Sequence, residues 1–247
     1  MRNHRDIAVI IPSYREDKNI EILLKQINIY LPGAKVFIVD DSNIQDNRKI
    51  GEIVARYKNA KLISRFIKMG RGSAVIAGFK EALKDKNINY CFEMDSDLAH
   101  YPGEIPRFLD KIKEKKFDVI IGSRYIKNGK TINIVISRII LSRIINLFLR
   151  MWLSIKLTDF TGGFRIYNRK SIEFLSNIKL RAKGFIMLSE TIYLLHRNNF
   201  KIGEVPITVS IKKDGKSNAD VKEFTDSLFF VIKMRLENTF FSRLPWK

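Results

Sequence analysis

The residues of this chain best suited to chemistry are two carboxylates separated by one residue, Asp95 and Asp97. They follow the short apolar run at 89–92, which is typical of a buried strand. Two carboxylates at the end of one strand repel each other unless a cation lies between them. A hard divalent cation that carries a diphosphate on its other side meets that need. Solvated acids in a turn are the simpler interpretation of a lone Asp-x-Asp, because the pattern is short and common.

Further polar residues follow two other apolar runs, at 7–11 and 35–39. The carboxyl ends of parallel strands meet at one edge of a sheet, so we expect these residues to share a crevice with the acid pair. Asp40, after the second run, is placed to accept hydrogen bonds from a ribose or a base. The segment 68–72 carries glycines that permit close backbone approach and cations that suit phosphate, although a turn explains its Gly-x-Gly equally well.

Strand-like and helix-like segments alternate through the first half of the chain. We expect strands at 7–11, 35–39, 61–66, 89–92 and 117–121, and helices at 19–30, 50–57, 73–83 and after Pro102. This alternation predicts an α/β protein with a mostly parallel sheet and helices on both faces.

Composition limits the classes of partner. The chain has 247 residues, 45% of them hydrophobic, which is enough for one domain with its own core. Its net charge of +19 predicts an anionic partner: nucleic acid, an anionic membrane surface or a phosphorylated substrate. No run of about 18 apolar residues is free of charge, so a spanning helix is not expected.

The segment 132–157 is strongly apolar but interrupted by arginines. On a helix, Arg138, Ser142 and Arg150 fall on one side, and most of the large apolar residues fall on the other. Two interpretations remain open. Either the apolar side packs on the sheet and the arginines face water, or the helix lies in a membrane interface with its arginines at headgroup phosphates. A last helix is expected at 221–238, followed by a basic and aromatic tail at 240–247.

Seven short motifs in this order resemble family 2 of the inverting glycosyltransferases, which have a GT-A fold. The motifs are IIPSYRED at 10–17, VDDSN at 39–43, KMGRGSA at 68–74, MDSDLAHYP at 94–102, IGSRY at 121–125, DFTGGFRIY at 159–167 and KIGEVPI at 201–207. Within that family the chain is similar to dolichyl-phosphate mannose synthases and related polyprenyl-phosphate hexosyltransferases. The resemblance implies a Rossmann-like GT-A domain at 1–217, and a C-terminal amphipathic helix and tail at 218–247.

The resemblance also implies how the nucleotide diphosphate sugar is held. By position, four residues correspond to those that hold the nucleoside: Pro12, Tyr14, Glu16 and Asp40. Asp95 and Asp97 correspond to the pair that engages Mg²⁺ or Mn²⁺ and the donor diphosphate, and Lys68 is assigned to the donor as well. Glu190 corresponds to an acid on a later helix.

For the lipid phosphate acceptor, the resemblance implies a set of cations. Arg124 corresponds to a basic residue near the transferring phosphate, and Arg138 and Ser142 to residues that bind the acceptor phosphate. Lys212 stands where relatives carry an arginine in a late loop. The roles assigned as catalytic fall on Asp97, Arg124 and Arg138.

The chemistry agrees with these roles. The acceptor phosphate is already an anion, so no general base is needed to activate it. The protein must bring two anions together, which calls for a metal and several arginines whose forks bind phosphate. Attack opposite the leaving group inverts the anomeric centre, so an α-linked donor gives a β-linked product.

The sequence therefore predicts transfer of a hexose, foremost mannose from GDP-mannose, to a polyprenyl or dolichyl phosphate. UDP-glucose or another UDP-sugar is the alternative donor. A nucleic-acid partner is not expected, because the charge comes without a recognition motif. An inactive scaffold is disfavoured by the intact Asp95, Asp97 and Arg124. We expect a peripheral enzyme on the cytoplasmic face, held on an anionic membrane surface by its amphipathic segments and its charge, or by a small membrane subunit.

Overall fold

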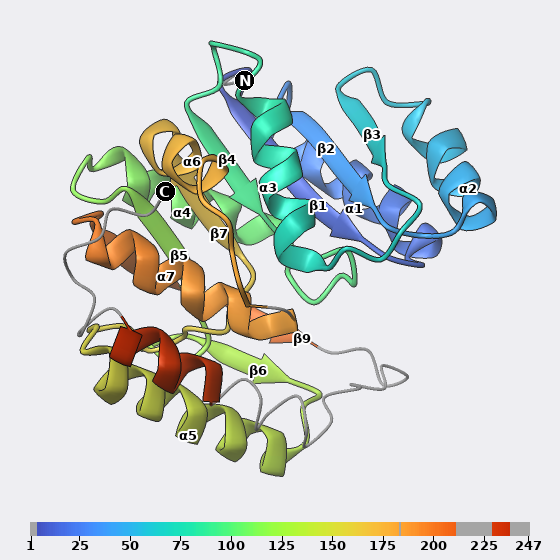
Figure 1. Cartoon of the computed structure of the whole chain (residues 1–247). Coiled ribbons are helices and arrows are strands. Elements are labelled where there is room, and N and C mark those ends of the chain that lie inside the picture. The colour runs from blue at the N-terminus through green and yellow to red at the C-terminus, as the bar shows by residue number, and fades with distance from the viewer. Residues whose placement is uncertain (1–3, 183, 211–228, 238–247) are drawn as a thin grey trace.

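A seven-stranded sheet forms the centre of the molecule. The computed structural model describes residues 4–182, 184–210 and 229–237 (Figure 1). The strands lie in the order β3-β2-β1-β4-β7-β5-β8. Their bounds are β1 (Ile7–Ser13), β2 (Lys35–Asp40), β3 (Ala60–Ser64), β4 (Tyr90–Glu93), β5 (Val119–Ser123), β7 (Arg165–Asn168) and β8 (Ile202–Pro206). β7 runs antiparallel to both neighbours and the other pairings are parallel, so the predicted mostly parallel sheet is confirmed.

Helices cover both faces of the sheet, as predicted. They are α1 (Asp17–Tyr30), α2 (Ile44–Val54), α3 (Arg71–Ala82), α4 (Ile105–Lys113), α6 (Arg169–Ser176) and α7 (Met187–Arg197). A further helix, α5 (Ile136–Leu153), does not cover the sheet (Figure 1). Short 3₁₀ turns lie at η1 (Pro102–Glu104) and η2 (Gly184–Ile186), and β6 (Lys130–Ile132) pairs with β9 (Thr208–Ser210) in a second small sheet. One apolar core lies between the sheet and α3, α6 and α7, and the other lies beneath α1, α2 and α4.

The central strand β1 is buried on both faces, which explains its continuous apolar run. Ala8 and Ile10 face one core, and Ile7, Val9 and Ile11 face the other. α3 lies close over β1, because a Cβ at Gly78 would come within 2.3 Å of Cγ2 of Ile10. This close packing places the first residue of α3, Arg71, over the carboxyl ends of the strands.

Predicted boundaries shift by a few residues in several elements, and two of the shifts have a clear cause. Pro12 does not end the first strand, which continues to Ser13. Pairing between β1 and β4 stops at Ile10, so on that side Pro12 has no neighbour that would need its missing N–H. α2 begins at Ile44 rather than Ile50, because Oδ1 of Asn43 accepts a 2.9 Å hydrogen bond from the Asp46 N–H and caps the helix.

α5 lies at one end of the molecule, apart from the large sheet (Figure 1). Residues 229–237 are helical and pack against it, with Nε1 of Trp152 donating a 3.3 Å hydrogen bond to the carbonyl of Val231. The rest of the C-terminal helix predicted at 221–238, and the whole tail at 240–247, lie outside the described residues. No helix in the described ranges combines the length and the apolar character that crossing a membrane requires.

Candidate active site

A pocket of about 270 Å³ opens at the carboxyl ends of the parallel strands. The loops after β1, β2 and β4 and the start of α3 build its walls. Its lining is Pro12, Ser13, Tyr14, Glu16, Asp41, Lys68, Gly70, Arg71, Ala74, Asp95, Ser96 and Asp97. Six residues predicted to bind the donor or its metal thus lie together: Pro12, Tyr14, Glu16, Lys68, Asp95 and Asp97.

Asp95 is held by a guanidinium group. Oδ1 of Asp95 accepts hydrogen bonds from Nε of Arg71 at 2.9 Å and from its Nη2 at 2.7 Å. The same guanidinium also donates through Nη1 to the buried Glu93. Burial by itself would raise the pKa of Asp95, but the charge and hydrogen bonds of Arg71, together with other nearby basic groups, outweigh burial and hold that pKa below its usual value. Asp95 is therefore ionised.

This network reaches deeper into the sheet through Tyr167, whose hydroxyl donates a 2.7 Å hydrogen bond to Glu93. Arg71 belongs to the segment 68–72, whose cations were predicted to suit phosphate, whereas no role was predicted for Glu93 or Tyr167. On β7, Tyr167 lies two positions from Arg165, the register partner of Glu93, and only the three-dimensional pairing of β4 and β7 reveals this contact.

Asp97 is exposed at the rim of the pocket. Its Oδ1 accepts a 2.9 Å hydrogen bond from the N–H of Ala99, across a turn in which Leu98 has a left-handed φ of 63°. Partial loss of hydration inside the pocket raises the pKa of Asp97, and the neighbouring charge of Asp95 raises it further.

The acid pair fits a divalent cation that the donor helps to hold. In the described ranges, no group of three or more His, Cys, Asp or Glu side chains is arranged to bind a metal. Mg²⁺ is commonly bound through one or two carboxylates, with substrate phosphates and water as the other ligands. One oxygen of Asp95 and one of Asp97 are already engaged by Arg71 and Ala99, so the second oxygen of each is the one suited to a cation.

Asp40, predicted to hold the nucleoside, is not among the residues that line the pocket. Its side chain is fully buried and accepts hydrogen bonds from Ser42 and from Nδ2 of Asn47. The next residue, Asp41, lines the pocket instead. Oδ1 of Asp41 accepts from Nε of Arg65 at 2.6 Å, and its Oδ2 accepts from the N–H groups of Met69 and Gly70. Asp41 thereby anchors the loop that leads into α3.

The anchored loop presents apolar and basic groups beside Tyr14. Nζ of Lys68 lies 4.7 Å from the centre of the Tyr14 ring, a cation–π contact. Phe66, Ile67 and Met69 are exposed on the same loop, and Phe66 has a left-handed φ of 56°. A strained, non-glycine backbone conformation of this kind is common in ligand-binding loops.

His100, within the same motif as the acid pair, has a structural role. It is buried and stacked on Phe164, with ring centres 5.2 Å apart, and its Nδ1 accepts a 3.3 Å hydrogen bond from the Asp95 N–H. Burial lowers the pKa of His100 despite the nearby carboxylates, so the imidazole is neutral.

Arg124 interacts electrostatically with Asp95, but the guanidinium of Arg124 is bound to the buried Asp159. Its Nε and Nη2 donate to the two carboxylate oxygens of Asp159 at 2.7 and 2.8 Å, and Nη2 also reaches Oγ1 of Thr161 at 2.9 Å. Sequence reasoning missed Asp159, which lies 35 positions away in the chain. The guanidinium is thereby fixed before any ligand arrives.

Tyr125 joins this region to α5. Its hydroxyl donates a 2.7 Å hydrogen bond to Oγ of Ser142, and the Arg143 guanidinium lies 5.8 Å from its ring centre. Arg138 is exposed one turn before Ser142 on the same helix. The structure thus brings Arg124 and Ser142 near each other through Tyr125. Lys212 lies outside the described residues.

Glu190 is buried and binds backbone rather than facing the pocket. Its carboxylate accepts hydrogen bonds from the N–H groups of Arg181 and Ala182 at 2.8 to 3.0 Å. Burial raises the pKa of Glu190, and these backbone donors oppose the rise. In this structure its role is to hold the loop before α7.

Curated relatives cover most of this chain. It is 29% identical over 225 residues to a polyprenol monophosphomannose synthase of Mycolicibacterium smegmatis, covering 90% of this chain and 84% of the relative. It is 30% identical to an undecaprenyl-phosphate mannosyltransferase of Micrococcus luteus, covering 85% and 86%. It is 34% identical over 234 residues to a dolichol-phosphate mannosyltransferase of Pyrococcus furiosus, covering 92% of this chain and 63% of the longer relative.

Solved structures share the fold. Glucosyl-3-phosphoglycerate synthase from Mycobacterium tuberculosis, crystallised with Mn²⁺, UDP and glucosyl-3-phosphoglycerate, superposes with a TM-score of 0.64 at 16% identity, covering 94% of this chain and 79% of that one. The family model described as glycosyl transferase family 2 matches residues 8–175, which hold the whole pocket. This chain therefore belongs to glycosyl transferase family 2, has the GT-A fold and is a glycosyltransferase.

Proposed function

We propose that this enzyme transfers mannose from GDP-mannose, with inversion, to a polyprenyl or dolichyl phosphate. The observation that carries the proposal is the pairing of two features. One is a pocket with two carboxylates and a basic loop, and the other is a set of arginines next to an exposed apolar helix. The three curated relatives described above are named for mannose transfer to lipid phosphates, which supports this donor and acceptor class.

The donor half of the reaction belongs to the small pocket. We assign the nucleoside to the wall formed by Pro12, Tyr14 and Glu16, with Lys68 beside the phosphates. Asp95 and Asp97 would hold Mg²⁺ or Mn²⁺, which neutralises charge on the departing diphosphate. Asp41 keeps the loop of Lys68 in place through its hydrogen bonds to Arg65, Met69 and Gly70.

The acceptor half belongs to the strip between Arg124 and α5. Arg124 is fixed by Asp159, and Ser142 is fixed by Tyr125, so both groups are oriented before the lipid phosphate arrives. Arg138 is exposed on the same helix and would meet the phosphate as it enters. The acceptor oxygen is already anionic, so none of these groups needs to remove a proton.

α5 supports attachment to a membrane surface. Its buried side carries Asn146, Leu149 and Leu153, and within the described ranges the large apolar stripe on the opposite side is exposed. Residues of that stripe recur every three or four positions and are 53% to 73% exposed: Ile136, Ile140, Ile144, Leu147 and Met151. Of the two interpretations of segment 132–157, the exposure of this stripe favours a membrane interface over packing on the sheet.

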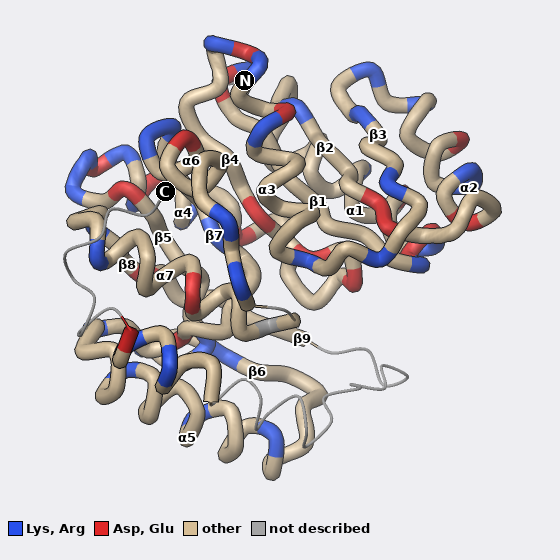
Figure 2. The backbone as a smooth tube through the Cα atoms, viewed as in Figure 1, with Lys and Arg blue, Asp and Glu red and all other residues tan. Residues whose placement is uncertain are grey.

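The arginines of α5, together with its exposed apolar stripe, give the pattern expected of a helix in a membrane interface. Figure 2 shows basic residues recurring along α5, and Arg143 and Arg150 are exposed there. An exposed apolar stripe beside arginines suits acyl chains and anionic headgroups together. We therefore assign the enzyme to the cytoplasmic face of a membrane as a peripheral protein. A small membrane subunit that covers the same stripe is the competing explanation, and binding to pure lipid vesicles separates the two.

A transfer assay tests the proposal. Purified enzyme is incubated with undecaprenyl phosphate and either GDP-mannose or UDP-glucose, with Mg²⁺, with Mn²⁺ or with EDTA. We expect a mannosyl lipid phosphate from GDP-mannose, loss of product in EDTA, and a β-linkage by NMR. Faster transfer from UDP-glucose would reject the donor assignment, and undiminished transfer in EDTA would reject the metal.

A further inference from the structure

Arg71 lies between the carboxylates of Glu93 and Asp95, which repel each other unless a positive charge lies near both. It is 14% exposed and lines the pocket, and its fork joins the carboxylates of Glu93 and Asp95. Nη2 also approaches the carbonyl of Gly163 at 3.4 Å, and Nη1 approaches Sδ of Met187 at 3.6 Å. The guanidinium is therefore oriented from several sides, and it places a positive charge on Oδ1 of Asp95 without any metal.

A fixed cation next to Asp95 opposes the binding of a second one. Arg71 engages Oδ1 of Asp95 through two hydrogen bonds, and its positive charge repels an incoming divalent ion. The same guanidinium faces the pocket proposed for the donor diphosphate, where an arginine fork attracts phosphate oxygens. One side chain thus weakens the binding of a bare cation and strengthens that of an anion.

We propose that Arg71 makes metal binding depend on the donor: the pocket binds a cation weakly alone and firmly only together with a nucleoside diphosphate. This inference rests on the proposed donor site and adds a residue that sets the order of binding. Arg71 is a positioning residue for Asp95 and a counter-charge for the diphosphate.

The test measures binding without turnover. Binding of Mn²⁺ alone is followed by electron paramagnetic resonance, and GDP affinity with Mn²⁺ present is measured by calorimetry. The main variant is Arg71→Met with Glu93→Gln, which removes one cation and one buried carboxylate together. The matched control, Lys61→Met with Glu81→Gln, removes the same charges from an ion pair at the far end of α3. Circular dichroism and thermal melting establish that each variant is folded.

We expect the main variant to bind Mn²⁺ alone at least about tenfold more tightly than the wild type, and GDP with Mn²⁺ about tenfold more weakly. The control should match the wild type in both. Should the double variant fail to fold, Arg71→Lys serves in its place. Its single ammonium cannot reproduce the fork, so Mn²⁺ alone should bind about threefold more tightly.

Two results would overturn the inference, and they are distinguishable. If the wild type binds GDP with Mn²⁺ but the folded variant binds Mn²⁺ alone no more tightly, Arg71 is a structural ion pair and the donor site stands. If the wild type binds neither Mn²⁺ nor GDP in any combination, the proposed donor site fails and this inference fails with it.

Discussion

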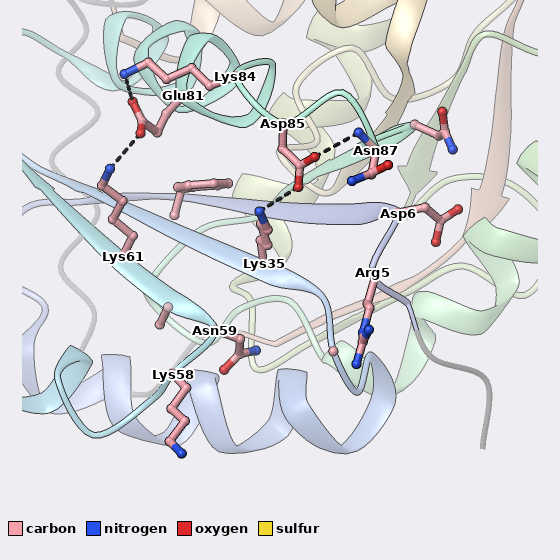
Figure 3. Close-up of a pocket in the computed structure, with 14 residues that line it drawn as sticks. Arg5, Asp6, Lys35, Lys58, Asn59, Lys61, Glu81, Lys84, Asp85 and Asn87 are labelled. Carbon is pink, nitrogen blue, oxygen red and sulfur yellow. Dashed lines mark hydrogen bonds and ion pairs between the residues drawn. The ribbon is translucent and has the colours of Figure 1, made fainter.

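Two pockets lie at opposite ends of the same parallel strands, and they differ in size and in chemistry. The one at the amino ends is lined by Arg5, Lys35, Lys58, Lys61, Lys84 and Asp85, among others (Figure 3), and has about 1030 Å³, against about 270 Å³ at the carboxyl ends. Its ion pairs are made by solvent-exposed lysines. Lys35 meets Asp85 at 2.6 Å and Lys61 meets Glu81 at 2.7 Å, with the lysine side chains 45% and 60% exposed.

The smaller pocket is built differently. Its carboxylates are held by arginine forks, with Arg65 on Asp41 and Arg71 on Asp95, and these two arginines are 10% and 14% exposed. The loops after β1, β3 and β4 each contain a non-glycine residue with a left-handed backbone, namely Arg15, Phe66 and Leu98. Fixed charge and strained loops mark a site prepared for a ligand, whereas volume alone does not.

The largest expected difference between the two pockets is in the loss of kcat/KM when a carboxylate of each is neutralised. Asp97→Asn should lower kcat/KM by at least about 100-fold, because it removes half of the charge that would hold the donor cation. Asp85→Asn, in the larger pocket, should change kcat/KM by less than about twofold. Steady-state transfer kinetics on both variants check this, and comparable losses would remove the distinction between the pockets.

A smaller loss of activity is expected at Arg138, and it should distinguish acceptor binding from donor binding. Arg138→Ala should raise the KM for polyprenyl phosphate by about tenfold, on the scale of one charge-assisted hydrogen bond, and slow transfer. GDP affinity should be nearly unchanged, because the pocket lining does not include Arg138. Arg138→Lys should recover part of the loss, since a point charge does not reproduce a fork.

Calorimetric titration of GDP beside transfer kinetics on the same Arg138 variants makes this decisive. If GDP affinity falls as far as transfer does, Arg138 belongs to the donor site. The acceptor phosphate must then be bound elsewhere, with Arg143 and Lys212 as the next candidates.

Substitutions in the exposed stripe of α5 should cause a more modest change, in the affinity of the protein for vesicles. The wild type should co-sediment with anionic vesicles, and rising salt should weaken the binding because it screens the charge. Ile140→Ser with Ile144→Ser should weaken binding about fivefold to tenfold, because two exposed apolar groups are lost. Equal binding of the wild type to neutral and anionic vesicles would show that charge does not attach the protein.

The smallest effect is expected from the ion pairs of the larger pocket. Lys61 and Lys84 hold the pKa of Glu81 below its usual value of 4.5, chiefly through hydrogen bonds. Their contribution to stability is therefore present above about pH 4.5 and is lost as the pH falls through the lowered pKa. Because the lysines are exposed, Glu81→Gln should lower the free energy of unfolding by no more than about 1 kcal/mol at neutral pH. Urea unfolding at pH 7 and pH 3 measures this, and a loss above about 2 kcal/mol would contradict it.

The sequence predicted local features of the fold well and long-range partners poorly. The helix expected at 19–30 is found as α1, and Ile20, Leu23, Leu24 and Ile27, which recur at helical spacing in the sequence, are its buried residues. The acid pair was recognisable because both members follow one strand. By contrast, Arg71 and Glu93 are 22 positions apart, and Arg124 and Asp159 are 35 apart. No local pattern indicates which arginine meets which acid.

Asp40 shows a subtler limit. The sequence places Asp40 and Asp41 together after one strand, and the direction of each side chain depends on its neighbours in space. Asn47 and Ser42 draw Asp40 inward, while Arg65 and the 69–70 backbone hold Asp41 at the pocket. Neighbouring side chains along a strand point in opposite directions. Contacts with other elements decide whether Asp40 or Asp41 is the one that faces the pocket.

The most direct test of the account is to locate the cation. Crystals of the enzyme grown with Mn²⁺ and GDP would be examined by anomalous scattering at the manganese edge. We predict one peak in contact with the carboxylates of Asp95 and Asp97, with the diphosphate of GDP as a further ligand. A peak beside Asp85 in the larger pocket, or GDP bound with no peak at the acid pair, would contradict the assignment of the carboxyl-end pocket as the active site.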